Sequence, residues 1–220
     1  METGIKSMSA IRRISKVRHS LSTKTNGRPS FFIIPGFKQK AGNRSFSWLE
    51  KFLKGRGFEV VRVPILWERR TMKEYVEDFI EVYKKHQSGE NYVLGFSYGA
   101  VIALLSANAI KPKKIYLCSL SPDFKEDVSV MKPWLKKYVG KRRIAYSLKT
   151  SGREVAKNLE IPSVIFYGEA EVKDYPQTKV RCEETVKLAA RSKLVVVKES
   201  SHQIDFPAYK IAITKELKNI

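Results

Sequence analysis

Histidine and cysteine are scarce in this chain, with three histidines and two cysteines among 220 residues. No pair of either residue type has the spacing of a metal-binding motif, so we expect no metal and no cofactor. Cys118 and Cys182 lie far apart in the sequence. This arrangement predicts buried thiols in a reducing compartment rather than a disulfide framework.

Long apolar runs are also absent. No run reaches 18 apolar residues, so no segment is expected to span a membrane. The first residues lack an apolar stretch followed by a small-residue cleavage site, which argues against a secretory signal. Together with the cysteine pattern, these features predict a cytoplasmic location.

Acidic residues are few beside basic ones, 22 against 42, which gives a formal net charge of +20. Residues 1–28 carry seven basic and one acidic side chain, and residues 111–157 carry thirteen and four. Such a charge favours nucleic acid, an anionic membrane or a negatively charged substrate as partner, although a merely solubilising surface has the same composition. The aromatic residues do not follow the pattern of a known nucleic-acid module.

The composition divides the chain into two parts. Residues 1–28 are polar and basic, and we interpret them as a flexible N-terminal arm. Residues 29–220 have the length and apolar content of one folded domain. Within it, residues 121–160 are expected to form two or three short helices and are a candidate small cap.

Short apolar runs alternate with amphipathic stretches through the folded part. The expected strands are 31–34, 58–65, the run that ends before Ser97, 115–118, 164–167 and 194–197. The expected helices are 45–54, one that opens with the capping box Thr71-x-x-Glu74, one after Ser97 that ends at Lys111-Pro112, one near 177–190 and one from Pro207. This alternation predicts an α/β fold, a mostly parallel sheet of about six strands with helices on both faces.

The sequence Gly95-Phe-Ser97-Tyr-Gly99 joins a β-rich run to an Ala- and Leu-rich helical stretch. A serine on such a sharp turn has a strained backbone, and a Cβ at either flanking glycine would collide with the turn. The turn exposes the hydroxyl and leaves the next backbone N–H free. This pattern is typical of a nucleophile elbow.

A serine nucleophile needs a base, because its hydroxyl is weakly nucleophilic by itself. His19 lies in the basic arm, and His86 lies near the end of a predicted helix, where it would complement the helix dipole. His202 follows the last predicted strand, at the edge of a parallel sheet where active sites gather. We therefore identify His202 as the candidate base.

With these motifs in order, residues 30–220 resemble the α/β-hydrolase superfamily. Pro35-Gly36-Phe37 follows the first strand, where members usually have His-Gly-x, and the first two of the usual eight strands are missing. The resemblance implies a small serine hydrolase with little or no cap. It also implies a triad acid in the loop after the fifth strand, where the family's Gly-x-x-Asp pattern falls on Glu171. Asp174 is the alternative, and Glu169 and Asp123 are weaker candidates.

The oxyanion hole is expected to combine the backbone N–H groups of Tyr98 and Phe37, since Gly36 allows its loop to approach closely. Phe37, Phe96 and Tyr98 are expected to form aromatic walls of the substrate pocket. The sequence thus predicts a cofactor-independent hydrolase that cleaves a carboxylic ester or thioester through an acyl-enzyme. The alternative is a catalytically degenerate module of the same fold that binds nucleic acid or an anionic membrane through its basic surface.

Overall fold

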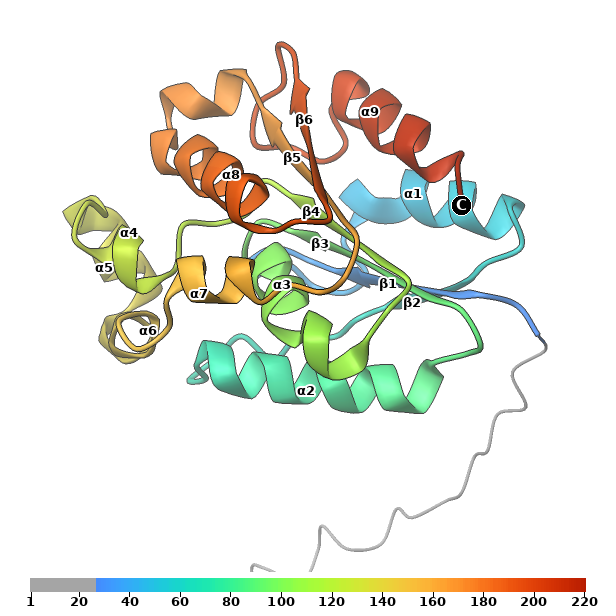
Figure 1. Cartoon of the computed structure of the whole chain (residues 1–220), viewed down its shortest axis with the longest axis horizontal. Helices are drawn as coiled ribbons and strands as arrows, with labels where there is room; N and C mark the ends of the chain where they lie inside the picture. The colour runs from blue at the N-terminus through green and yellow to red at the C-terminus, as the bar shows by residue number, and fades with distance from the viewer. Residues whose placement is uncertain (1–26) are drawn as a thin grey trace, which may run out of the picture.

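A computed structural model describes residues 27–220, which form one sheet of six strands, all parallel, in the order β2-β1-β3-β4-β5-β6 (Figure 1). The strands are β1 (Ser30–Ile34), β2 (Glu59–Arg62), β3 (Asn91–Phe96), β4 (Lys114–Cys118), β5 (Ser163–Gly168) and β6 (Ser192–Val197). The predicted parallel sheet is confirmed. The arm predicted over residues 1–28, which includes His19, lies outside the described residues except for Gly27 and Arg28.

Burial explains the central strands, and a proline explains why the edge strand β2 is short. Every residue of β1 and β3 is buried, because helices cover both faces of the sheet. The strand predicted over residues 58–65 is shorter in the structure, since β2 covers only 59–62. Pro64 has no N–H to donate to a sheet, which explains why strand pairing does not continue through it. Val63 and Ile65 remain in the core as part of the following loop.

Two apolar layers enclose the sheet. One contains buried side chains of α2 (Met72–His86), α3 (Tyr98–Ile110) and α8 (Pro176–Leu188), and the other contains those of α1 (Ser47–Gly55) and α9 (Pro207–Leu217). The capping box at the start of α2 is present: the Glu74 carboxylate accepts hydrogen bonds from the N–H and the hydroxyl of Thr71, each at 2.8 Å. No helix within residues 27–220 is both long and apolar enough to cross a bilayer.

Residues 121–160 form four short helices rather than the predicted two or three. These are α4 (Lys125–Val128), α5 (Pro133–Val139), α6 (Lys141–Ser147) and α7 (Gly152–Lys157), between β4 and β5. Pro133 begins α5, and Gly140 separates α5 from α6 with a positive φ of 92° that a residue with a side chain rarely adopts. Helices α4, α5 and α6 cluster at one end of the molecule, away from the middle of the sheet (Figure 1).

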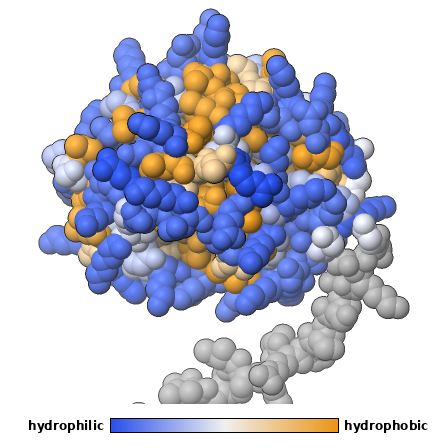
Figure 2. Space-filling view, viewed as in Figure 1, coloured by the Kyte–Doolittle hydropathy of each residue, from blue (hydrophilic) through white to orange (hydrophobic). Residues whose placement is uncertain are grey.

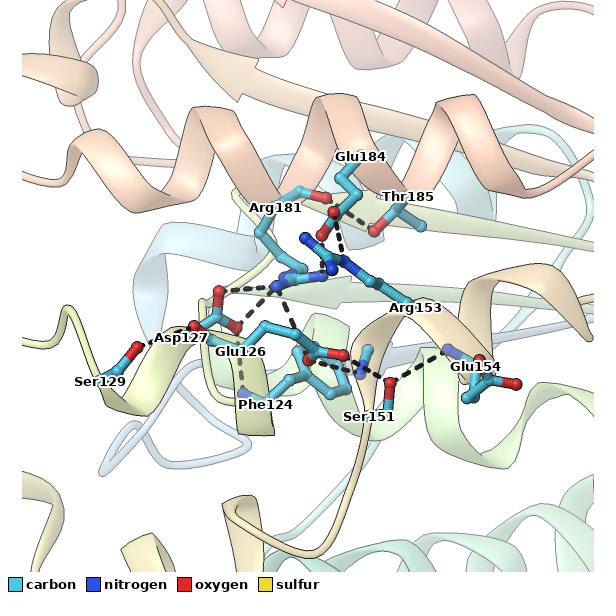
Figure 3. A network of polar contacts seen from close by, with 11 residues as sticks. Phe124, Glu126, Asp127, Ser129, Ser151, Arg153, Glu154, Arg181, Glu184 and Thr185 are labelled. Carbon is cyan, nitrogen blue, oxygen red and sulfur yellow. Dashed lines mark hydrogen bonds and ion pairs between the residues drawn. The ribbon is translucent and has the colours of Figure 1, made fainter.

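A buried ionic network fastens these helices to the rest of the domain (Figure 3). Arg181 of α8, only 1% exposed, donates to both carboxylate oxygens of Asp127 in α4, at 3.1 and 2.7 Å, and to Glu184 at 2.7 Å. Burial by itself would raise the pKa of Glu126, but hydrogen bonds from Ser151 and the N–H of Gly152 lower it to about 2. Both acidic residues of α4 therefore face the interior.

Two short 3-10 helices complete the described elements. The first, η1 (Arg44–Phe46), leads into α1, and the second, η2 (Ala170–Lys173), follows β5. The second of these matters for the site, because it contains Glu171 and lies in the acidic loop after β5.

Candidate active site

Ser97 occupies the sharp turn between β3 and α3, with φ 56° and ψ −118°. This left-handed backbone is strained for a residue with a side chain. A Cβ on Gly95 would overlap the backbone of Gly99, and a Cβ on Gly99 would overlap the carbonyl oxygens of Ile34 and Pro35. The two glycines therefore let the strand, the turn and the helix pack closely around the serine.

His202 reaches this turn from the loop that follows β6. Its Nε2 lies 3.0 Å from Oγ of Ser97, a hydrogen-bonding distance. The imidazole ring lies against two aromatic rings, with centroids 4.9 Å from that of Phe96 and 5.2 Å from that of Tyr175. These contacts hold the ring in place while 27% of the side chain stays exposed.

Glu171 lies on the other side of the imidazole, in η2. Its Oε2 is 2.9 Å from Nδ1 of His202, and its side chain is fully buried. A carboxylate only accepts hydrogen bonds, so this contact places the ring proton on Nδ1 and leaves Nε2 free to accept the proton of Ser97. The carboxylate also accepts from the N–H of Gly168 at 3.2 Å and from the hydroxyl of Ser119 at 2.8 Å.

Backbone contacts hold the acidic loop and the histidine loop together. The carbonyl of Ser200 accepts from the N–H groups of Ala170 and Glu171, at 3.0 and 3.2 Å. Gly168 packs directly on Ser200, where a Cβ would overlap the Ser200 carbonyl. The position of Glu171 relative to His202 is therefore set by two loops that are fastened to each other.

The other acidic candidates do not contact His202. Asp174 is exposed and lines the cavity beside the site, and Glu169 is exposed and accepts from the N–H of Glu199 at 3.3 Å. Asp123 is buried and accepts from the hydroxyl of Ser147 at 2.9 Å. Among the described carboxylates, Glu171 is the one hydrogen-bonded to the imidazole.

The pKa of Asp123 is well above the ordinary value for an aspartate. Burial raises its pKa to about 7, against the lowering effect of the hydrogen bond from Ser147. Its other carboxylate oxygen, Oδ2, and the hydroxyl of Tyr98 are both buried without a hydrogen-bond partner. Asp123 therefore behaves as a buried acid in the wall of the site rather than as a partner of the imidazole.

Two serines that were not predicted from the sequence lie in the site. Ser119 is buried after β4, with a positive φ of 50°, and donates to Glu171. Oγ of Ser121 lies 3.1 Å from Oγ of Ser97. The available signal in the sequence was their position just after a predicted strand. This signal is weak, because serines in many proteins occupy such positions without belonging to a site.

The loop that carries Phe37, an expected oxyanion-hole residue, lies beside Ser97. A Cβ on Gly36 would lie 3.4 Å from Cβ of Ser97, so the loop that carries Phe37 runs directly beside the nucleophile. Oε1 of Gln39 accepts from the N–H of Gly36 at 2.8 Å and shapes this loop. Within residues 27–220, the N–H groups of Phe37 and Tyr98 donate to no other protein group. Both are available to a negatively charged oxygen.

A cavity of about 400 Å³ opens beside Ser97 and His202. Phe37, Phe96 and Tyr98, the expected pocket residues, all line it, and α5 supplies much of another wall. The remaining apolar lining residues are Pro122, Val130, Met131, Trp134, Leu135, Tyr138, Val139, Tyr175 and Pro176. The lining is thus mainly apolar, and its polar residues are Gln39, Ser97, Ser121, Asp123, Asp127, Lys132, Asp174, Gln177, Thr178 and His202.

His86, the other described histidine, lies apart from this pocket. His86 is the last residue of α2, and its carbonyl accepts a hydrogen bond from the hydroxyl of Ser30 at 3.0 Å. It does not line the cavity. In the part of the chain that the structure describes, no group of three or more His, Cys, Asp or Glu side chains could hold a metal ion.

Comparisons with known proteins give a clear result for the fold alone. No family model and no curated protein matches the sequence. Solved structures do match, among them alpha/beta hydrolase domain-containing protein 10 from mouse, with 12% identity, a TM-score of 0.73 and coverage of 87% of this chain and 88% of that one. Est1E from Butyrivibrio proteoclasticus, solved with ferulic acid, has 15% identity, a TM-score of 0.69 and coverage of 90% and 91%.

A lipase-esterase related protein from Clostridium acetobutylicum is similar at 18% identity, with a TM-score of 0.61 and coverage of 87% of this chain and 93% of that chain. In each case nearly the whole of both chains is matched, although the sequences have diverged widely. The strand order, the turn at Ser97 and these likenesses together show that the chain has the fold of the α/β-hydrolase superfamily.

Proposed function

We propose that this protein is a cofactor-independent serine hydrolase that cleaves a carboxylic ester or thioester through an acyl-enzyme. The observation that carries the proposal is the continuous chain of contacts from Glu171 through His202 to Ser97, at 2.9 and 3.0 Å. The protein would take small or flexible substrates whose acyl or aryl part fits an apolar cavity of about 400 Å³. The named esterase and lipase-related neighbours support this class of reaction by their fold.

In the proposed reaction, Oγ of Ser97 attacks the substrate carbonyl and passes its proton to Nε2 of His202. The N–H groups of Phe37 and Tyr98 stabilise the resulting oxyanion, and Glu171 stabilises the charged imidazole. His202 then gives the proton to the leaving alcohol or thiol as the acyl-enzyme forms. A water molecule, deprotonated by His202, releases the acid and restores Ser97.

The test is covalent labelling with a fluorophosphonate probe, which reacts with activated serines. We expect stoichiometric labelling at Ser97, loss of hydrolysis of p-nitrophenyl esters or acyl-coenzyme A thioesters, and no labelling of the Ser97→Ala variant. In that variant kcat should fall by roughly 10⁴-fold or more. His202→Ala should have a similar effect, since the two residues act as a unit.

The rival proposal is a degenerate module that binds nucleic acid or an anionic membrane, which the net charge of +20 favours. A folded protein that takes no label and hydrolyses no ester or thioester would support the rival. The domain division, with a basic arm over residues 1–28 and a small cap within 121–160, stays part of the proposal. So does a cytoplasmic location, for which the free, buried thiols of Cys118 and Cys182 are the support.

A further inference from the structure

The mouth of the cavity is bordered by large apolar side chains that face solvent. Val130 is 56% exposed, Trp134 53% and Tyr138 49%, and all three line the cavity. Trp134 and Tyr138 are four residues apart on α5, so they lie on the same face of the helix. Leu135 and Val139 of the same helix are less exposed. Helix α5 thus has one apolar face toward the domain and aromatic side chains on its outer surface.

The segment that carries these aromatic side chains has many more basic than acidic residues. Helices α4 to α7 and their connections, residues 125–157, contain ten basic and three acidic residues. Two of the acidic residues, Glu126 and Asp127, contact the network around Arg181 in the interior. The lysines of this segment that form no ion pair with the described residues are Lys125, Lys132, Lys136, Lys137, Lys141 and Lys149.

We propose that α5 and the preceding Val130 dock on an anionic lipid surface, with the mouth of the cavity facing the lipid. Aromatic side chains next to lysines are the combination that favours the boundary between lipid headgroups and acyl chains. Each lysine near such a surface contributes through attraction to anionic headgroups. The edge formed by α4 and α5, at the left of both views, has hydrophobic and hydrophilic residues side by side (Figure 2).

The charge also argues against other occupants of this surface. A second copy of the chain would bring the same lysines face to face, and like charges oppose such contact. Single-stranded nucleic acid would match the charge and the aromatic rings. However, the aromatic side chains border a cavity whose lining is mainly apolar and includes the carboxylates of Asp123, Asp127 and Asp174, so that it accepts hydrocarbon more readily than phosphate. An acyl chain of a lipid fits both the rim and the cavity behind it.

Docking itself does not require catalysis. Transfer of acyl substrates from the lipid toward Ser97 by the docked protein rests on the proposed hydrolase function. For this reason binding is measured on the Ser97→Ala variant as well as on the unmodified chain. If both bind lipid and neither hydrolyses an ester, the hydrolase proposal fails while the docking proposal stands.

The experiment is sedimentation of the full chain with vesicles of phosphatidylcholine alone and with vesicles that also contain phosphatidylglycerol. We expect binding to the anionic vesicles only, weakening as salt increases. The variant Lys136→Gln/Lys137→Gln should bind roughly 10- to 30-fold more weakly, because each lysine near an anionic surface contributes about 1 kcal/mol to the free energy of binding. Neither lysine lines the cavity, so hydrolysis of a soluble ester should be unchanged.

The matched control is Lys84→Gln/Lys85→Gln at the end of α2, which removes the same charge near the amino end of β1, where the carbonyl of His86 accepts from Ser30. Both variants retain residues 1–28, so a difference between them reports on α5 and not on the basic arm. Equal binding by the two variants, or equal binding to neutral and anionic vesicles, would overturn the proposal. So would RNA binding that depends on Lys136 and Lys137 in the absence of vesicle binding.

Trp134 provides a second readout of the same contact. It is the most exposed of the three tryptophans, since Trp67 is buried and Trp48 is partly buried. Lipids with brominated acyl chains should quench its fluorescence when the protein binds. Trp134→Phe should remove that quenching, and quenching that persists in this variant would place a different face on the lipid.

Discussion

The hydroxyl of Ser119 donates a hydrogen bond to Oε2 of Glu171 over 2.8 Å, and neither side chain is accessible to solvent. A second hydroxyl, that of Tyr209, lies 2.8 Å from Oγ of Ser119. Since the single Ser119 proton is given to the carboxylate, Tyr209 must be the donor in the second contact. Hydrogen bonds thus converge on Glu171 from two sides, from Tyr209 through Ser119 and from Ser97 through His202.

Ser119→Ala should weaken the site without removing any group that touches substrate. The variant leaves one oxygen of a buried carboxylate with a single partner, so we expect a loss of about 1–3 kcal/mol in the free energy of unfolding. It should also lower kcat, with little change in KM, because Glu171 would orient His202 less well. Urea denaturation and ester kinetics measure the two effects, and Ser129→Ala, an exposed serine in the same part of the chain, is the control. An unchanged kcat would remove Ser119 from the positioning role.

Glu171→Gln should lower kcat by roughly 10²- to 10⁴-fold, because the amide no longer stabilises a positively charged His202. The matched control is Glu169→Gln in the same loop, which removes an exposed carboxylate that does not line the cavity. Asp174→Asn should cost much less than Glu171→Gln. A larger loss for Asp174→Asn would transfer the acid role to that residue. Steady-state kinetics on a soluble ester measure all three variants.

Asp123 should make the stability of the protein depend on pH. Burial raises its pKa from 3.8 to about 7, so between these values the folded state binds a proton that the unfolded state has lost. The free energy of unfolding therefore receives a contribution from Asp123 that falls as the pH rises from about 4 to 7. Asp123→Asn should remove this decline and be the more stable protein at pH 8.

Urea denaturation of both proteins from pH 5 to pH 8 measures the difference. The difference in the free energy of unfolding should reach a few kcal/mol at most, because a change of one in a pKa corresponds to about 1.4 kcal/mol. The oxygen of the asparagine amide can still accept the hydrogen bond from Ser147, so the substitution should not disturb the packing. Parallel pH profiles for the two proteins would show that Asp123 is charged throughout this range.

Arg181→Met should detach the short helices from the domain. It leaves the carboxylate of Asp127 buried and unpaired, which costs about 3–5 kcal/mol when one member of a buried ion pair is removed. Arg181→Met/Asp127→Leu should recover most of this loss, since it removes the orphaned charge as well. Hydrogen exchange should show faster opening of α4 and α7 in the single variant than in the double one. Equal exchange in both would mean that the network does not hold these helices.

Much of the fold was readable in the sequence because it follows from local patterns. Apolar runs that are buried on both faces, amphipathic stretches and glycines flanking Ser97 each report on a few neighbouring residues. The strand over 58–65 was predicted too long, because its apolar pattern continues past the proline that ends its pairing. The four helices of residues 121–160 were undercounted, since segments of one or two turns give hardly any periodicity.

The sequence by itself determined that a strained serine would lie at the end of a central parallel strand, and that one histidine would follow the last strand. It left the acid open, because three carboxylates within six residues have the same local character. Only the tertiary structure decided which carboxylate contacts His202. It fastens the loop of Glu171 to the carbonyl of Ser200 and buries Glu171 against Ser119. Only the tertiary structure also places the aromatic side chains of α5 at the cavity. Contacts between segments far apart in the chain depend on how the whole sheet and its loops pack, and no local pattern records that.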